Sequence, residues 1–481
     1  YFPMEVIDME NTIVRLHKIW INNFKNVEYG HLNFENSRKS YKASVLGLYG
    51  QNGSGKTALI DAVSLLKLAL SGRPVPLYYS DSIHVKSNYA TFKFQFNIIE
   101  CQKKFEVFYE FKLKKELDTT NETNIAEGEP KYRSALFNEK LSYSYEDSEK
   151  KLRLSTLIDT DSKEAFSPKT KYEILVGKEK DTSIDLLIQK KLAFVTSRSF
   201  IFSKELLDTI RNYSQSQQQN QDLNRHLFVL EKLVNYGNYD LFVINTSNSG
   251  LISLNALPLT FRYSRNNRRF LGQIPVSLNG PTTIPDDMLQ IVRDVCENMN
   301  IVLSKIVPGL TIGVKDLGQH LMKNGETGRR IQLMSYKNSE EIPLQFESQG
   351  IKKIVSILQL LIVVYNKSSI TVAIDELDSG IFEYLLGELL KIISEKGKGQ
   401  LIFTSHNLRP LETIDRGFVA FTTTNPQNRY IRFNHVKDNH NLRDFYFRDI
   451  VLGEQSEEVY EPTNNYEIAL AFREAGEAIE P

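Results

Sequence analysis

The stretch Gly50-Gln51-Asn52-Gly53-Ser54-Gly55-Lys56-Thr57 decides the fold of this 481-residue chain. It fits the pattern G-x-x-x-x-G-K-[ST], with an apolar run before it (45–49) and a segment of helical apolar periodicity after it (57–70). Glycines let such a loop curl so that its backbone N–H groups point at phosphate oxygens, and the helix N-terminus adds positive potential there. The stretch therefore predicts a strand, a phosphate-binding loop and a helix.

Two side chains of this loop have the chemistry that a nucleoside triphosphate requires. We expect the Lys56 ammonium to reach the β- and γ-phosphates of ATP and the Thr57 hydroxyl to bind Mg²⁺. The sequence thus predicts a site for ATP and Mg²⁺, although the loop alone indicates only that phosphate is bound.

A second motif supplies candidate catalytic groups. The apolar run 370–374 predicts a strand that ends in Asp375 and Glu376, where ligands bind in open α/β sheets. We expect Asp375 to hold the metal through its water shell and Glu376 to orient and deprotonate the attacking water. The next predicted strand, 401–404, is followed by His406, which could contact the γ-phosphate.

Composition is that of an ordinary soluble protein, with 41% hydrophobic and 25% charged residues. No run approaches the roughly 20 apolar residues of a membrane span, and no signal peptide is evident, so a cytoplasmic protein without a membrane partner is expected. Cys101 and Cys296 are predicted to be reduced core residues. Lys plus Arg and Asp plus Glu number 59 each, which disfavours autonomous DNA binding but leaves a local basic groove open.

Periodicity along the chain predicts an α/β fold with a strand-rich insertion. Clean alternation over 92–98 and 105–113 indicates two half-buried antiparallel strands, and the polar segment 114–131 is predicted to be a mobile loop. Helices are expected over 200–235, with an interruption at 214–221, and over 286–306, 350–366 and 381–396. We expect an N-terminal ATPase half at 4–200, a helical and irregular insertion at 201–330, and a C-terminal ATPase half at 331–481.

A third motif is Glu347-Ser348-Gln349-Gly350, which precedes a basic, apolar helix and lies shortly before Asp375. Together, the three motifs resemble those of the ABC-type ATPases of the SMC, RecF and OLD group. The resemblance implies an ATPase head with a mixed sheet, an antiparallel β lobe and an inserted helical region. It also implies that Ser348 and Gly350 are signature residues, which contact the γ-phosphate bound to the other subunit.

Further roles follow only from this resemblance. Asp378, in the D-loop-like sequence LDSG, would cross a dimer interface, and His406 resembles the switch histidine. Lys25, in WINNFKNV, would approach the nucleotide. The segment that contains Ser197, Arg198 and Ser199 falls where the Q-loop is expected, although no glutamine lies at its centre.

Within that group, the compact layout without coiled-coil heptads is most similar to the stand-alone ATPase subunits of OLD-like anti-phage and abortive-infection systems (PARIS-like, AbiL-like). This similarity implies a homodimer or a higher even oligomer that works beside a separate effector protein, such as a Toprim-type nuclease. The residues after 425 are too few to hold such a nuclease, so the effector is expected to be a second protein.

Two alternatives stay open. A RecF-like repair ATPase would bind DNA directly, and the arginine-rich stretch FRYSRNNRRF (261–270) interleaves aromatic residues with Arg262, Arg265, Arg268 and Arg269. A transporter ATPase subunit is the weaker alternative, because the NFKN turn, the strand-rich insertion and the ESQG form of the signature disfavour it.

Overall fold

The computed structural model describes residues 12–36, 38, 42–118, 131–245, 256–265, 268–322, 325–433, 441–453 and 455–477, with the backbone alone described over 256–275. Strands are β1 (Thr12–Phe24), β2 (Val27–Asn33), β3 (Ser44–Tyr49), β4 (Ala90–Glu100), β5 (Lys103–Leu117), β6 (Tyr132–Glu146), β7 (Lys151–Asp159), β8 (Leu241–Ile244), β9 (Ala256–Arg265), β10 (Arg268–Ser277), β11 (Thr282–Pro285), β12 (Thr311–Leu321), β13 (Thr327–Lys337), β14 (Glu340–Pro343), β15 (Thr371–Ile374), β16 (Gln400–Thr404), β17 (Val419–Thr422) and β18 (Tyr430–Ile431). Helices are α1 (Lys56–Leu70), α2 (Leu77–Asp81), α3 (Lys169–Val176), α4 (Lys180–Val195), α5 (Lys204–Ser216), α6 (Gln221–Asn235), α7 (Leu289–Ile306), α8 (Gln349–Asn366), α9 (Glu383–Lys396), α10 (Pro410–Thr413), α11 (Leu442–Leu452) and α12 (Asn465–Glu477).

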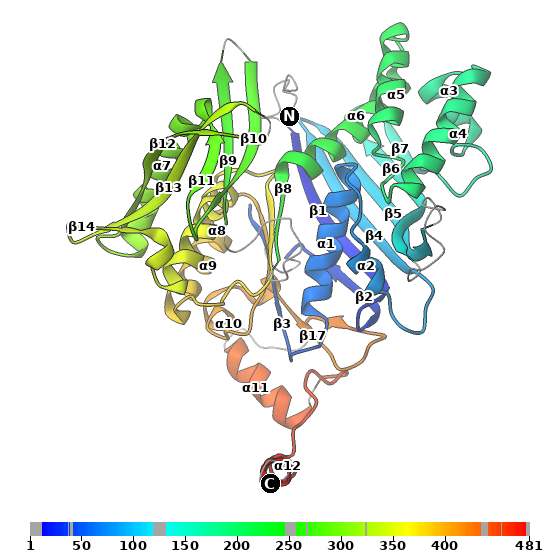
Figure 1. Cartoon of the computed structure of the whole chain (residues 1–481). Coiled ribbons are helices and arrows are strands. Elements are labelled where there is room, and N and C mark those ends of the chain that lie inside the picture. The colour runs from blue at the N-terminus through cyan, green and yellow to red at the C-terminus, as the bar shows by residue number, and fades with distance from the viewer. Residues whose placement is uncertain are drawn as a thin grey trace, which may run out of the picture.

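The central sheet has the order β18-β17-β3-β16-β15-β8 (Figure 1), and its neighbours are parallel except for the β17–β18 pair. β3 carries the phosphate-binding loop, β15 ends just before Asp375, and β16 lies between them. Because the carboxyl ends of parallel strands meet at one edge, the sheet brings the loop, the carboxylates and His406 to the same edge. β8 lies within the range predicted as an insertion, yet it is the edge strand of this sheet.

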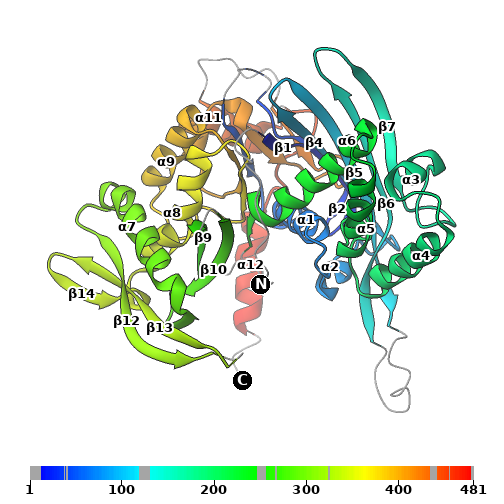
Figure 2. The ribbon, with the colours of Figure 1, turned by 90° about the horizontal axis from the view of Figure 1, so that it is seen from above.

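Both faces of the central sheet are covered, which explains its continuous apolar strands. Along β3, Leu46 and Leu48 belong to the core shared with α1 and the antiparallel sheet. Val45 and Tyr49 belong to the opposite core, which includes α8 and α9. Figure 2 shows α1 and α2 on one side of the molecule and α8 and α9 on the other. This two-sided packing fixes α1, and with it the loop that precedes it.

A six-stranded antiparallel sheet, of order β2-β1-β4-β5-β6-β7, packs against α1. Helices α3 to α6 lie beside its far strands (Figures 1 and 2). The alternation over β4 and β5 is confirmed, because Phe92, Phe94, Phe96 and Ile98 are fully buried and pair with the equivalent face of β5. This sheet is the antiparallel β lobe that the sequence predicts.

Two local predictions were wrong. β5 continues to Leu117, so the first residues of the predicted 114–131 loop are strand; the rest of that range, from 119 to 130, lies outside the described residues. Cys101 is exposed at the β4–β5 turn rather than buried, with a left-handed φ of 54°. A tight hairpin turn keeps its side chains at the surface whatever their polarity. Cys296, in contrast, is buried as expected.

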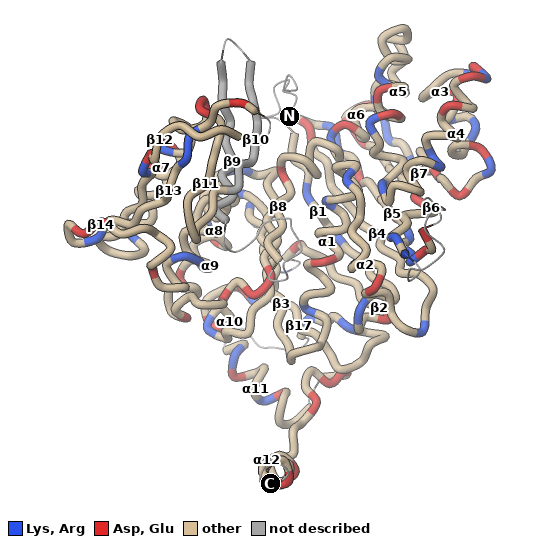
Figure 3. The backbone as a smooth tube through the Cα atoms, viewed as in Figure 1, with Lys and Arg blue, Asp and Glu red and all other residues tan. Residues whose placement is uncertain are grey.

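The remaining part forms a smaller lobe. β11, β13, β12 and β14 make an antiparallel sheet, and α7 packs on β12 and on α8. Acidic and basic residues are interspersed over the described chain (Figure 3), in keeping with the zero net charge. Within the described residues, none of the helices combines the length and the apolar character needed to cross a lipid bilayer.

Candidate nucleotide site

The phosphate-binding loop joins β3 to α1, and its three glycines have positive φ angles of 154° (Gly50), 75° (Gly53) and 99° (Gly55). Gly55 is the N-cap residue of α1. A Cβ atom on Gly50 would lie 1.7 Å from Oγ1 of Thr422, so only glycine fits there. The glycine spacing therefore reflects both backbone conformation and the closeness of β17.

Lys56 is the buried first residue of α1, and its ammonium bends back over the loop. Its Nζ atom donates hydrogen bonds to the carbonyl oxygens of Gly50 (2.8 Å) and Gln51 (2.9 Å). Burial lowers the pKa of Lys56, and the carboxylates of Asp375, Glu376 and Asp378 oppose this shift. The lysine of the loop and the predicted carboxylates thus share one electrostatic environment, as a nucleotide site requires.

Thr57 and Asp375 are the residues predicted to hold Mg²⁺, and that assignment stays a prediction. The half-buried Thr57 hydroxyl has no hydrogen-bond partner among the described residues. The described residues contain no group of three or more His, Cys, Asp or Glu side chains that could hold a metal alone. Mg²⁺ is commonly bound by one or two protein oxygens together with nucleotide phosphates and water.

Thr404 at the end of β16 links the two carboxylate residues. Its Oγ1 atom donates to Oδ1 of the buried Asp375 (2.6 Å) and accepts a hydrogen bond from the backbone N–H of Glu376 (2.8 Å). One hydroxyl therefore fixes both the orientation of Asp375 and the turn at Glu376. Sequence reasoning missed Thr404, although its place directly before Ser405-His406 was a usable signal.

Glu376 has a left-handed φ of 48°, a conformation unfavourable for a residue with a side chain. Lys353 on α8 donates from Nζ to the carbonyl oxygen of Glu376 (3.3 Å) and is only 6% exposed. Burial lowers the pKa of Lys353 to about 8, while the carboxylates of Asp378, Glu376 and Asp375 raise it. Lys353 was also missed; the signal was a lysine on the otherwise apolar face of the signature helix.

Asp378 organises the loop that carries His406. Its Oδ2 atom accepts hydrogen bonds from the backbone N–H groups of His406 (3.0 Å) and Asn407 (2.9 Å). The His406 side chain is exposed and makes no hydrogen bond or ion pair with another described residue. Asp378 thus has partners within its own chain, and a role across a dimer interface stays a prediction.

The predicted signature is the start of α8. Ser348 is its N-cap, and its hydroxyl accepts a hydrogen bond from the N–H of Ile351 (3.3 Å). Gly350 packs so tightly on the D-loop that a Cβ atom there would lie 2.4 Å from the carbonyl oxygen of Gly380. Ser348 itself is exposed, so the capped helix end faces outward.

Lys25 lies close to α1, because its ammonium forms an ion pair with the buried Asp61 carboxylate of that helix. Asn245, just after β8, donates a hydrogen bond to the same carboxylate. Burial raises the pKa of Asp61 and Lys25 lowers it. In this structure Lys25 is therefore part of the support of α1, and direct contact with a nucleotide stays a prediction.

The residues considered for the Q-loop lie against the antiparallel lobe. Ser197 donates to the carbonyl oxygen of Ser134, and Ser199 donates to the Glu139 carboxyl group. Arg198 is exposed. Among the described residues, no hydrogen bond joins these three to the phosphate-binding loop.

The fold and the site define a P-loop nucleotide-binding protein of the α/β class. The sequence profile of the family described as "AAA domain, putative AbiEii toxin, Type IV TA system" matches residues 45–412, from β3 to α10. The chain belongs to this family and carries an ATPase domain of the AAA type. The coarser prediction of a P-loop ATPase is thereby confirmed, whereas the OLD-like subgroup stays a prediction.

No curated protein matches the chain. Solved structures with a similar arrangement include the SMC head domain from Thermotoga maritima, with 15% identity and a TM-score of 0.33 over 87% of this chain and 99% of that one. The Smc head domain with a coiled coil and joint from Pyrococcus yayanosii has 10% identity and a TM-score of 0.37 over 88% and 98%.

Proposed function

We propose that this chain hydrolyses ATP with Mg²⁺ and works as an ATP-dependent homodimer that controls a separate effector protein in anti-phage defence. The observation that carries the proposal is the shared environment of Lys56, Asp375 and Glu376 beside an outward-facing signature. Lys56 would bind the terminal phosphates, Thr57 and Asp375 would hold Mg²⁺, and Glu376 would act as the general base.

Support for a dimer comes from the surface around Ser348. Phe346, two residues before it, is 70% exposed, and Phe382, two residues after Gly380, is 71% exposed. The Gly350–Gly380 contact brings the two segments that carry these rings together. Exposed aromatic residues gathered beside a capped helix end are typical of an interaction surface. A second copy would bring its Ser348 and Gly350 to the γ-phosphate bound by this copy's loop.

Catalysis is tested with Glu376→Gln, which keeps the size and polarity of the side chain but removes the base. We expect the variant to bind ATP normally and to lose steady-state hydrolysis, whereas Lys56→Ala should lose ATP binding itself. Phosphate release and nucleotide affinity are measured separately. Unchanged turnover in the Glu376→Gln variant would eliminate Glu376 as the base.

The two-chain site is tested by mixing two inactive variants. Lys56→Ala keeps a good signature, and Ser348→Arg keeps a good phosphate-binding loop, so a mixed dimer contains one intact site. Random pairing should restore about a quarter of the wild-type ATPase rate, since about half of the dimers are mixed and each has one of two sites. No recovery on mixing would show that each site is complete within one chain.

The second part of the proposal is that the ATPase controls an effector protein, and it rests on the similarity to OLD-like defence ATPases. Co-expression with the product of a neighbouring gene tests it: toxicity or nuclease activity should require both proteins and should change in the Glu376→Gln variant. Activity of the neighbour that is indifferent to this chain would remove this part and leave the ATPase intact.

Direct DNA binding is the alternative function, and the arrangement of arginines on β9 and β10 favours it. β9 and β10 pair so that Arg265 lies opposite Arg268, with Arg262 and Arg269 within the next few positions of the two strands. The pairing therefore gathers four arginines near one end of a two-stranded sheet. Affinity for duplex DNA that falls steeply with salt, and that is lost when these arginines are neutralised, would favour this alternative.

A further inference from the structure

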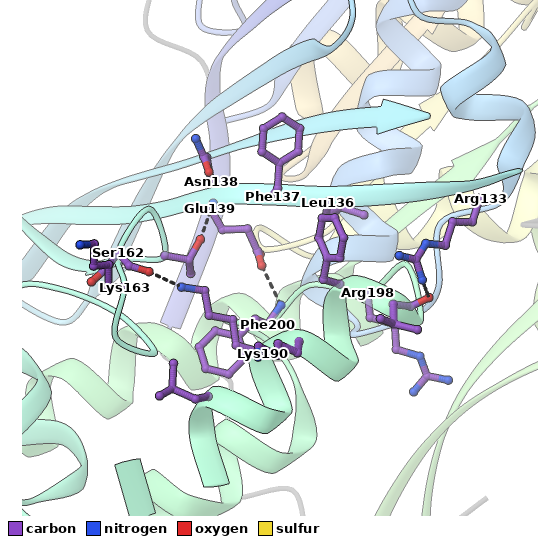
Figure 4. A pocket seen from close by; sticks show the side chains of 15 residues that line it. Arg133, Leu136, Phe137, Asn138, Glu139, Ser162, Lys163, Lys190, Arg198 and Phe200 are labelled. Atoms are coloured by element: carbon purple, nitrogen blue, oxygen red, sulfur yellow. Dashed lines mark hydrogen bonds between the residues drawn. The ribbon is translucent and has the colours of Figure 1, made fainter. Parts of the chain in front are cut away.

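A cavity of about 470 Å³ lies in the antiparallel lobe between β6 and α4 (Figure 4). Its other walls come from the segment after β7 and from the connection between α4 and α5. None of the residues that line it belongs to the phosphate-binding loop or to the carboxylate loop at 375–378. The cavity is therefore separate from the proposed ATP site.

The walls of this cavity are largely apolar and aromatic. Leu136 and Phe200 are buried, and Leu187 and Phe194 of α4 complete the apolar lining. The face of the Phe194 ring is attractive to cations, since the guanidinium of Arg133 lies 5.4 Å from its centre. The size and the apolar lining are those of a small-molecule site, for which about 300–1,000 Å³ is usual.

The polar part of the lining is strongly basic. Five cationic side chains line the cavity: Arg133, Lys163, Lys190, Lys191 and Arg198. Three of these, Lys163, Lys191 and Arg198, are exposed and make no ion pair within the described residues. Such an excess of unpaired positive charge around an apolar hollow favours an anionic ligand.

Among the described residues, Glu139 is the one carboxyl group that lines the cavity, and it does not offset this charge. It is buried, burial raises its pKa while hydrogen bonds from Ser199 and Tyr109 lower it, and one carboxyl group cannot balance five cations. Its oxygens already accept hydrogen bonds from the N–H of Phe200 (2.7 Å) and the hydroxyl of Tyr109 (2.7 Å). The cluster of charges thus stays positive.

Lys190 is held at the cavity without a carboxylate partner. Its Nζ atom donates to the carbonyl oxygens of Ser162 (2.9 Å) and Glu164 (3.0 Å), and Figure 4 shows it reaching from α4 toward Ser162. The acidic groups nearby are engaged elsewhere: Asp159 pairs with Lys140 (3.5 Å), and Asp161 accepts from the Asn138 amide (3.2 Å). Burial lowers the pKa of Lys190, and the carboxyl groups of Asp161, Asp159 and Glu139 oppose this shift without forming an ion pair with its ammonium. An ammonium whose hydrogen-bond partners are backbone carbonyl oxygens is suited to bind a phosphate oxygen as well.

We propose that this cavity binds a nucleoside monophosphate. The planar base would pack among Phe194, Leu187 and Phe200, and the phosphate would meet the lysine and arginine groups at the opening. A free phosphate ion would use only the charges, and a nucleoside only the apolar walls, so the combination selects a ligand that has both.

The test uses the full chain with Lys56→Ala, because this change disables the ATP site and leaves the second site alone. AMP, GMP, CMP and UMP are each titrated by calorimetry, with inorganic phosphate and adenosine as half-ligands. We expect one molecule of at least one nucleotide to bind per chain, and the half-ligands to bind at least about tenfold more weakly, as expected when two groups of contacts contribute.

The site is then assigned by removing its three exposed cations in Lys163→Ala, Lys191→Ala, Arg198→Ala. Affinity should fall more than about tenfold, because charge-assisted hydrogen bonds to phosphate are lost. The matched control changes three exposed lysines elsewhere, Lys305, Lys391 and Lys396, to alanine and should leave the affinity unchanged. Absence of saturable binding by all four nucleotides up to about 1 mM, which corresponds to roughly −4 kcal/mol, would overturn the proposal. An equal loss in the control triple variant would also overturn it.

Discussion

Replacement of Lys67 by methionine tests how the structure handles a buried charge behind the phosphate-binding loop. Lys67 lies on the buried face of α1, where its ammonium donates to the carbonyl oxygen of Leu241 in β8. Its pKa is lowered from 10.5 to about 7, mainly by burial and also by Arg73, while Asp240 acts in the opposite direction. The charged form is therefore disfavoured by folding.

The sign and size of the effect follow from that pKa shift. Between pH 7 and 10.5 the unfolded chain holds the proton and the folded chain does not, so stability rises with pH in this window. At 1.36 kcal/mol per pKa unit, the full penalty is about 5 kcal/mol below pH 7, and about 2 kcal/mol of it disappears between pH 7 and pH 9. Methionine has no such penalty but leaves the Leu241 carbonyl unsatisfied, which costs about 1–3 kcal/mol.

The Lys67→Met variant should therefore be more stable than the wild type at pH 7, by on the order of 2 kcal/mol, with this advantage lost by pH 9. Urea unfolding at pH 6, 7, 8 and 9 gives the difference in free energy of unfolding at each pH. Lys391→Met, an exposed site on α9, is the control and should show no pH-dependent difference. A gap between Lys67→Met and wild type that is the same at pH 7 and pH 9 would refute the reasoning.

Two further substitutions test the site itself. Lys353→Met removes the hydrogen bond to the Glu376 carbonyl oxygen, which is worth about 1.5–3 kcal/mol, so kcat should fall about ten- to hundredfold while ATP affinity is retained. The control is Lys352→Met, which removes a hydrogen bond to the Gln345 carbonyl oxygen and should have nearly wild-type kcat. Equal losses of kcat in both variants would count against a role for Lys353. Gly50→Ala places a Cβ atom 1.7 Å from Thr422, whereas Gly53→Ala meets nothing within 4 Å and faces only the cost of its positive φ. ATP affinity should therefore fall much more for Gly50→Ala than for Gly53→Ala, for which a loss of about 1 kcal/mol in binding free energy is expected. Similar losses of affinity in the two variants would show that steric contact with Thr422 is unimportant.

The sequence predicted the elements whose signals are local. Periodicity and glycine spacing located β3, the loop and α1, and the apolar run 370–374 with its two carboxylates located β15. The order of the sheet, with β16 between β3 and β15 and β8 at its edge, depends on pairing between distant segments. No local pattern encodes that pairing, which is why β8 was placed in an insertion and left without a strand assignment.

The same distinction explains which site residues were found. Asp375 and Glu376 stand out because two carboxylates end an apolar run. Thr404 and Lys353 act through contacts with these residues from another strand and another helix. A threonine in a strand and a lysine in a helix do not stand out in a sequence. Their contribution to the site becomes visible only when the fold brings them into contact with the carboxylate loop.

The contacts of the carboxylate loop also bear on how a second chain would act. α8 touches the carboxylate loop through Lys353 at the Glu376 carbonyl, and it touches the residues just after that loop through Gly350 at the Gly380 carbonyl. Between these points, Asp378 holds the backbone that carries His406. A partner that displaces the start of α8 therefore has to move Gly380 or break a packed contact, and the loop transmits that movement to Glu376 and His406. Ser348, Glu376 and His406 are thus linked through packed contacts within one chain, so an interface formed at Ser348 is expected to shift Glu376, the proposed base.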